Sequence, residues 1–311
     1  MNYEQLYNNI QAYTENTEQL FVANIPVFVM EAEDRIYNSV QLPSLRKNVT
    51  GNFTAGNQYL ALPNDYLSTF SFAVIDSSNN YTFLLNKDVN YLREAYPATV
   101  ITNGTYQGTP GGLPRYYALF GSQLNDINEL TFMVAPTPDQ NYTVEMHYYY
   151  YPPTIVQGQI TTFGAITGGA SYTNGVYQNV ALTGGSGANA TADIVVVGGT
   201  VVQCTLKFGG NFYVVGDTLS CASIGNGIGF SIPVSGISNA TGTSWLGDNY
   251  DPVIFYGAMR EAMLFMKGEA DLVKYYEDKY TEALAQLNRL GTGLERGDAY
   301  RDGQARIKVS P

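Results

Sequence analysis

The chain has 311 residues, of which 45% are hydrophobic and only 14% are charged, and its formal net charge is −11. The hydrophobic share suffices for a folded core, whereas the acidic balance argues against a protein that grips nucleic acid across its surface. Two cysteines, Cys204 and Cys221, provide no framework for a disulfide-rich extracellular fold. The length allows one large domain or two ordinary ones.

The first residues are polar, and no apolar run approaches the ~18 residues that a membrane span needs. We therefore expect a product that is cytosolic when made and has no membrane partner. The Asn-x-Thr triplets then reflect an Asn- and Thr-rich composition rather than glycosylation sites.

Residues 1–45 contain two helical patterns. Apolar side chains recur at helical spacing in residues 2–13 and in residues 25–37, where Pro26 stands near the start. The second helix is expected to bury Val29, Met30 and Ile36 and to turn its charged side chains to water. Those charged side chains belong to Glu31, Glu33, Asp34 and Arg35.

Two more helices are predicted over residues 245–290. Asp251 and Pro252 form a helix start, with a carboxylate cap and a proline in the first turn. A further run opens at Glu269, and Gly291 is expected to end it. Carboxylates such as Glu261 are assigned to solvated helix faces. The predicted apolar stripe comprises Phe265, Leu272, Tyr276, Tyr280, Leu284, Leu287 and Leu290.

These two pairs of helices are expected to pack on each other. Amphipathic helices gain most of their stability from tertiary packing, so the pair at 245–290 needs a partner. The helices of residues 1–45 are the natural one, because chain termini usually lie close together. The stripe should therefore contact Leu6, Ile10, Val29 and Ile36.

From Arg46 the apolar period changes to two, which predicts a central antiparallel β domain over residues 46–151 with one short helix at 88–95. In the clearest strand, one face carries Tyr142, Val144, Met146, Tyr148 and Tyr150. The other face carries Thr143, Glu145, His147, Tyr149 and Tyr151. Aromatic rings on both faces suit a strand that is buried on one side and covered by a neighbouring subunit on the other.

A Gly-rich segment follows, and we interpret residues 160–237 as a small inserted all-β domain. Between Met146 and Gly247 only Asp193, Lys207 and Asp217 are charged. A disordered linker is the alternative, but runs such as 194–197 and 212–215 are too apolar to stay solvated. The predicted fold class is thus α+β: a helical bundle from both chain ends, a central antiparallel β domain and an inserted Gly-rich β domain.

The sequence contains no pattern that indicates catalysis, a metal site or a cofactor. His147 is the only histidine, and although Glu145 shares its strand face, no nucleophile motif accompanies them. One histidine and two cysteines fall short of a usual zinc site, so the cysteines are expected to pack as small apolar residues. The Gly-rich turns match neither phosphate-binding fingerprint.

An ordered set of short stretches carries a resemblance. They are FVANIP at 21–26, EDRIY at 33–37, PSLRKNVTG at 43–51, LNKDV at 85–89, PRYYA at 114–118, APTP at 135–138, WLGDNY at 245–250, FMKGEAD at 265–271 and GLER at 293–296. With them the chain resembles the head–tail adaptor (connector or neck) proteins of tailed bacteriophages, especially those of cyanophage-like and short-tailed phages. The segment 160–237 departs from that pattern.

The resemblance implies a non-enzymatic virion protein at the neck, made in the host cytoplasm. Such adaptors form a ring, usually twelve-fold, between the portal protein and a tail tube or nozzle protein, and DNA passes through without specific binding. The competing readings are a tail-associated carbohydrate- or host-binding protein, suggested by the aromatic β content, and a polysaccharide-degrading tail enzyme.

Residues 291–311 are expected to form an extended C-terminal arm. Spaced apolar anchors alternate there with charges, and such a segment cannot fold alone. A frayed terminus is the simpler reading; the resemblance instead implies an arm that contacts the portal or a neighbouring subunit. The predicted contact residues are Leu294, Arg296, Tyr300, Arg301, Arg306 and Ile307, together with Tyr149 and Tyr151.

Overall fold

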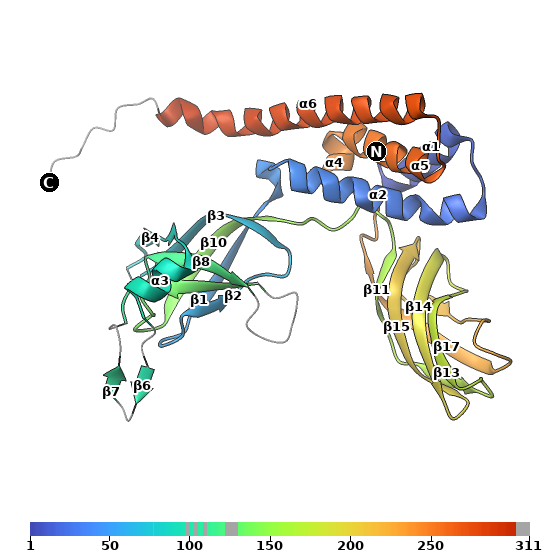
Figure 1. The fold of residues 1–311 in the computed structure, drawn as a ribbon, viewed down its shortest axis with the longest axis horizontal. Helices are drawn as coiled ribbons and strands as arrows, with labels where there is room; N and C mark the ends of the chain where they lie inside the picture. Colours follow the sequence, from blue (N-terminus) through green and yellow to red (C-terminus); the bar gives the residue numbers. More distant parts are fainter. Residues whose placement is uncertain (77, 98–99, 103–104, 108–110, 122–129, 303–311) are drawn as a thin grey trace. The chain divides into compact units, whose positions relative to one another are not determined.

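The computed structural model describes residues 1–76, 78–97, 100–102, 105–107, 111–121 and 130–302. Its contacts divide into two units, which we treat separately (Figure 1). The helical unit contains Met1–Val40 and Pro153–Gly297, and the sandwich unit centres on Gln41–Pro152. Helices and mostly antiparallel sheets occur together, which confirms the predicted α+β class.

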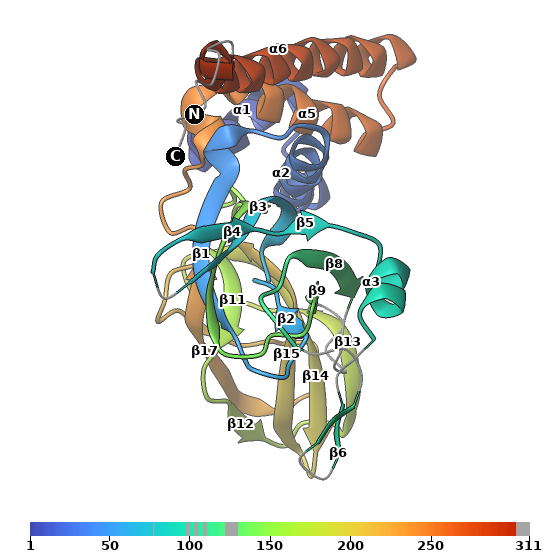
Figure 2. The same ribbon diagram turned by 90° about the vertical axis from the view of Figure 1, so that its left-hand side faces the viewer.

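In the helical unit, helices from both ends of the chain contact each other (Figure 2). Helices α2 and α5 approach closely, since a Cβ added at Gly257 would stand 2.9 Å from the Cβ of Ala32. Tyr3, Leu6 and Ile10 of α1 are fully buried. The helices are α1 (Tyr3–Thr14), α2 (Gln19–Ser39), α4 (Trp245–Asn249), α5 (Asp251–Phe265) and α6 (Ala270–Asp302).

Helix α2 begins at Gln19, six residues before the predicted start, and therefore has Pro26 in its interior. The reason is packing in the extra turns: the buried ring of Phe21 lies 5.7 Å from that of Phe28 and 6.2 Å from that of Phe265. These aromatic contacts offset the backbone hydrogen bond that a proline removes.

Helix α6 continues past Gly291 to Asp302, so the predicted end was wrong. A glycine inside a helix costs only about 1 kcal/mol relative to alanine, and helix-forming residues follow it at 294–296. The first part of the predicted extended arm is thus helical, and residues 303–311 lie outside the described residues. The predicted apolar stripe is buried at Tyr276, Tyr280 and Leu287 but not at Leu272 or Leu290, which are 46% and 40% exposed.

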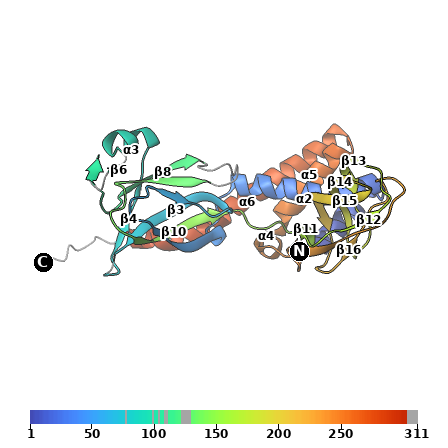
Figure 3. The same ribbon diagram turned by 90° about the horizontal axis from the view of Figure 1, so that it is seen from below.

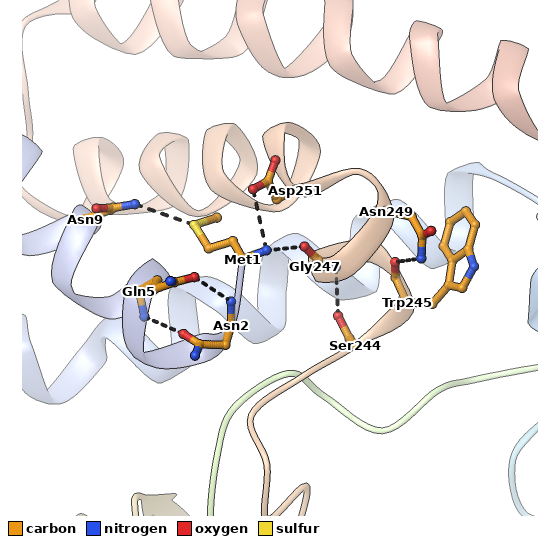
Figure 4. A network of polar contacts seen from close by, with 9 residues as sticks. All are labelled: Met1, Asn2, Gln5, Asn9, Ser244, Trp245, Gly247, Asn249 and Asp251. Carbon is orange, nitrogen blue, oxygen red and sulfur yellow. Dashed lines mark hydrogen bonds and ion pairs between the residues drawn. The ribbon is translucent and has the colours of Figure 1, made fainter.

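Asp251 is not the cap of α5, contrary to the prediction, because it occupies the first turn and Tyr250 takes the cap position. Its carboxylate lies 3.6 Å from the α-amino nitrogen of Met1 (Figure 4). That nitrogen also donates a hydrogen bond to the carbonyl oxygen of Gly247. The start of the chain is thereby fastened to α4 and α5.

The sandwich unit stacks two four-stranded sheets, with strand orders β1-β10-β3-β4 and β2-β9-β8-β5, and α3 covers the outer side of the second (Figure 3). Among the strands that the structure describes, only β5 and β8 pair in parallel. The 3-10 turn η1 (Pro43–Leu45) precedes β1, and the hairpin β6–β7 was not predicted. The elements are β1 (Arg46–Phe53), β2 (Tyr59–Ala61), β3 (Tyr66–Ile75), β4 (Tyr81–Phe83), β5 (Leu85–Asn86), α3 (Val89–Ala95), β6 (Val100–Thr102), β7 (Thr105–Gln107), β8 (Tyr116–Gly121), β9 (Thr131–Ala135) and β10 (Tyr142–Tyr150).

Strand β10 confirms the predicted alternation. The face with Val144, Met146 and Tyr148 joins Phe72 and Phe132 in the core between the sheets. The opposite face points away from that core, in register with the outward face of β1.

The Gly-rich module, residues 159–238, has its own core, to which both cysteines contribute, as predicted. Burial raises the pKa of Cys204 to about 11 and also raises that of Cys221. The two ends of the module adjoin, since Gln159 pairs with Ser238 and the Asn239 side chain donates to the Thr154 carbonyl at 2.8 Å. Its strands are β11 (Gln159–Phe163), β12 (Thr167–Ala170), β13 (Gly175–Ala181), β14 (Ala188–Val197), β15 (Thr200–Asn211), β16 (Thr218–Leu219) and β17 (Ile228–Ser238).

Glu33 was expected to face water but is buried, with 2% of its surface exposed. Its carboxylate accepts hydrogen bonds from the Thr154 hydroxyl at 2.5 Å and the Ile155 backbone N–H at 2.9 Å. Burial is the main cause that raises the pKa of Glu33 to about 7, and the two hydrogen bonds partly oppose it. Helical periodicity placed this residue on the solvent side because the segment that covers it comes from much later in the chain.

Glu261 was also expected in solvent and is buried, between two arginines. Arg260 donates to Glu261 at 2.7 Å and also to Glu277, while Arg35 lies 3.1 Å from the same Glu261 oxygen. A buried carboxylate needs such paired charges. The network joins α2, α5 and α6.

Leu287→Ala is expected to lower the free energy of unfolding by roughly 2–5 kcal/mol, because it leaves a cavity at a fully buried site. Leu290→Ala, on the exposed side of the same helix, should change it by less than about 0.5 kcal/mol. Urea unfolding of both variants measures the difference. Equal small losses would mean that α6 does not bury Leu287.

Glu33→Gln is expected to remove a pH dependence of stability. A carboxyl whose pKa is raised in the folded state stabilises the fold fully below its unfolded pKa of 4.5, and that contribution is lost as pH rises through about 7. The loss amounts to ~3 kcal/mol at most. A glutamine at position 33 can still form hydrogen bonds with Thr154 and Ile155. The melting temperature of Glu33→Gln should therefore fall less between pH 5 and pH 8 than that of the parent protein.

The control for this measurement is Glu31→Gln, an exposed carboxyl on the same helix, whose profile should follow the parent. If the melting temperatures of the parent protein and of Glu33→Gln change with pH in parallel, Glu33 is ionised in both the folded and the unfolded state.

Candidate subunit-contact surfaces

The outward face of the sheet β1-β10-β3-β4, which we call the sheet face, brings together residues from four strands. Glu145 is its polar centre: it accepts hydrogen bonds from Asn48 at 2.6 Å and Tyr81 at 2.8 Å, and His147 Nε2 lies 3.1 Å away. The Tyr81 hydroxyl is the largest of the causes that lower the pKa of Glu145. The carboxylate is thus held charged and oriented on an open surface.

Further along the same face, an arginine lies between two aromatic rings. The guanidinium carbon of Arg46 lies 3.7 Å from the centroid of the Phe70 ring and 5.0 Å from that of Tyr149. Its Nη2 donates to the Tyr149 hydroxyl at 2.6 Å. A planar guanidinium stacks on aromatic faces in this way and covers them from water. Phe70 nevertheless remains 54% exposed.

The two contact residues predicted on this strand differ in exposure. Tyr149 is only 7% exposed, because Arg46 and Phe70 cover it. Tyr151 is 37% exposed, and its backbone N–H donates to the carbonyl of Asp65 at 2.9 Å. The sheet face therefore presents Phe70, Tyr81 and Tyr151 rather than Tyr149. Pattern analysis identified the face but missed Arg46 and Phe70, whose pairing depends on strand register.

A second set of exposed apolar residues, the corner patch, lies on either side of the turn between α5 and α6. It consists of Leu264, Phe265, Leu272 and Tyr275. The sequence assigned Phe265 and Leu272 to the buried stripe. Phe265 does contact Phe28 of α2, with ring centroids 5.2 Å apart, yet a large part of its surface stays open.

The predicted contact residues of the C-terminal segment fall into two groups. Leu294, Arg296, Tyr300 and Arg301 lie on the last turns of α6, where the structure describes the backbone alone. Arg306 and Ile307 lie outside the described residues.

Within the described ranges, no three His, Cys, Asp or Glu side chains are placed to hold a metal ion. None of the helices in those ranges is both long and apolar enough to cross a membrane. The Glu145–His147 pair rests on an open sheet surface, with Tyr81 and Asn48 as its other partners.

Comparison with known families identifies the class of protein. The family model of the SU10 adaptor protein matches residues 1–176, which is more than half of the chain. The match covers α1, α2 and the sandwich unit and reaches the start of β13. No curated protein matches the chain.

The chain is therefore a structural adaptor of the bacteriophage virion, associated with other head and tail proteins. It belongs to the SU10 adaptor protein family, in agreement with the head–tail adaptor resemblance.

Proposed function

We propose that this chain is one subunit of a homo-dodecameric ring at the neck of the virion, docked beneath the portal protein and followed by a tail tube or nozzle protein. The subunit would be made in the host cytoplasm and join the particle during assembly. Membership of the SU10 adaptor family is the observation that carries the proposal.

The two apolar surfaces support a ring. A ring of identical subunits closes through a head-to-tail contact, which joins two different surfaces of the same chain. The sheet face and the corner patch are two such surfaces, on different elements and with different chemistry. Aromatic residues and arginine are enriched at the centres of protein interfaces, and the sheet face offers Phe70, Tyr81 and Arg46.

The charge balance supports a duct for DNA. Basic walls would hold phosphates and release counterions, whereas a chain of net charge −11 has no general affinity for them. DNA would then slide through the ring without specific binding.

The C-terminal segment supplies the portal contact in this proposal. Its anchors are three apolar and three basic residues: Leu294, Arg296, Tyr300, Arg301, Arg306 and Ile307. Basic residues there would add charge-assisted hydrogen bonds to acidic groups on the portal.

The direct test mixes the purified protein with portal rings and images the product by negative-stain electron microscopy, with native mass spectrometry for the copy number. Twelve copies on one face of each portal ring are expected. Binding to host cells without portal binding would favour a host-binding tail protein, and release of sugars from polysaccharide would favour a tail enzyme.

Phe70→Ala is expected to weaken ring completion on the portal by at least about fivefold in apparent affinity, because a central aromatic residue contributes more than ~1 kcal/mol to an interface. Leu119→Ala removes a similarly exposed apolar side chain from the other sheet and should leave assembly unchanged. Indistinguishable assembly of the two variants would remove the sheet face from the proposal.

A protein that ends at Leu290 is expected to keep its fold and to lose portal binding. Its circular dichroism spectrum should lose only the helical signal of residues 291–302, because the last buried residue of α6 whose side chain is described before the cut is Leu287. Co-sedimentation with portal rings measures the loss. If the shortened chain sediments with portal as tightly as the full chain, the C-terminal segment is not the portal contact.

A further inference from the structure

The Gly-rich module touches helix α1 at Asn211 and Phe212, and Phe212 has an unfavourable backbone conformation. Phe212, just past the end of β15, has φ of 62°. Bulky side chains rarely adopt this left-handed region, and a residue found there marks strain that its surroundings must hold in place. Its ring lies 5.2 Å from that of Tyr3 and 5.5 Å from that of Tyr7, both on α1.

The backbone around Phe212 is fastened to the segment that enters the module, residues 154–158. The Phe212 N–H donates to the Gln157 carbonyl at 2.7 Å, and the Tyr213 N–H donates to that of Gly158 at 3.1 Å. Gly158 has φ of 64°, and a Cβ there would lie 2.3 Å from the Tyr213 carbonyl oxygen. The fit therefore requires glycine at this position.

Polar contacts on both sides complete the junction. Asn211 donates to the Tyr3 hydroxyl at 3.1 Å in a buried setting. Glu33 of α2 holds Thr154 and Ile155 of the entry segment, and Asn239 ties the exit to the Thr154 carbonyl. The two crossing segments are thus joined to each other and to α2. The module contributes Asn211 and Phe212 to α1, and Gln159 lies 3.3 Å from the Met30 sulfur of α2.

We propose that this junction is a strained latch, which holds the Gly-rich module in one orientation on the helices and can open by withdrawal of Phe212 from Tyr3 and Tyr7. Opening that also breaks the hydrogen bond from the Phe212 N–H to the Gln157 carbonyl frees the backbone at Phe212 and relieves its strain. The module has a separate core, so it stays folded when the contact is lost. A closed state held by contacts and an open state relieved of strain make the junction a two-state element. The proposal goes beyond the adaptor role and does not depend on it.

The test measures the orientation directly by a spin-label distance in the full chain. Labels are placed at Leu20→Cys on α2 and Val197→Cys on β14, both exposed, after Cys204→Ser and Cys221→Ala. The parent should give one narrow distance distribution, and Phe212→Ala should give a broader, shifted one. Phe208→Ala, four residues earlier and within β15, is the control and should keep the narrow distribution.

A second variant separates strain from ring contact. Phe212→Gly loses the same rings but accepts a positive φ, so it should open the latch equally and melt at a higher temperature than Phe212→Ala. A narrow, unshifted distribution for Phe212→Ala would overturn the latch, as would loss of the β signal in its circular dichroism spectrum. If Phe212→Gly melts at no higher temperature than Phe212→Ala, the backbone at residue 212 is not strained and that part of the proposal is wrong.

Discussion

Two distant parts of this chain meet at one buried carboxylate. Glu33 of α2 accepts hydrogen bonds from Thr154 and Ile155, which follow it by 121 and 122 residues. A carboxylate in a protein interior persists only with such partners, since its transfer from water is unfavourable. The contact fixes where the chain returns to the helices after strand β10. The Gly-rich module, α4 and α5 all continue from that point, so their position depends on it.

Charged residues join the helices of the helical unit to one another. Arg35, Arg260, Glu261 and Glu277 form one network across three helices, and the Met1 amino group faces Asp251 at the start of α5. Among the exposed apolar residues are those of the corner patch and, in the other unit, those of the sheet face. A structural adaptor, which works by contact with other copies and other proteins, benefits from surfaces that cost little to dehydrate.

Local patterns predicted most of the elements but not their long-range partners. The alternation of β10 and the burial of Tyr280 and Leu287 followed from periodicity alone. Periodicity failed for Glu33, Glu261 and Leu272, whose exposure is decided by segments distant in sequence. It also failed for Gly291, because one glycine does not end a helix that helix-forming residues continue on both sides. On the sheet face it found Glu145, His147 and Tyr149. It could not find Arg46 and Phe70, because their stacking requires the register of three strands.

The pairing of strands at the ends of each β region bears on the order of folding. Arg46 pairs with Tyr149, so β1 and β10 close the sandwich region on itself, and Gln159 pairs with Ser238 to close the Gly-rich module. The entropic cost of bringing α2 to α5 grows with the length of open chain between them. Once both β regions have closed, that open chain is reduced to short connectors. We infer that the helices, although they contain both ends of the described chain, dock last, after two self-contained loops have drawn them together.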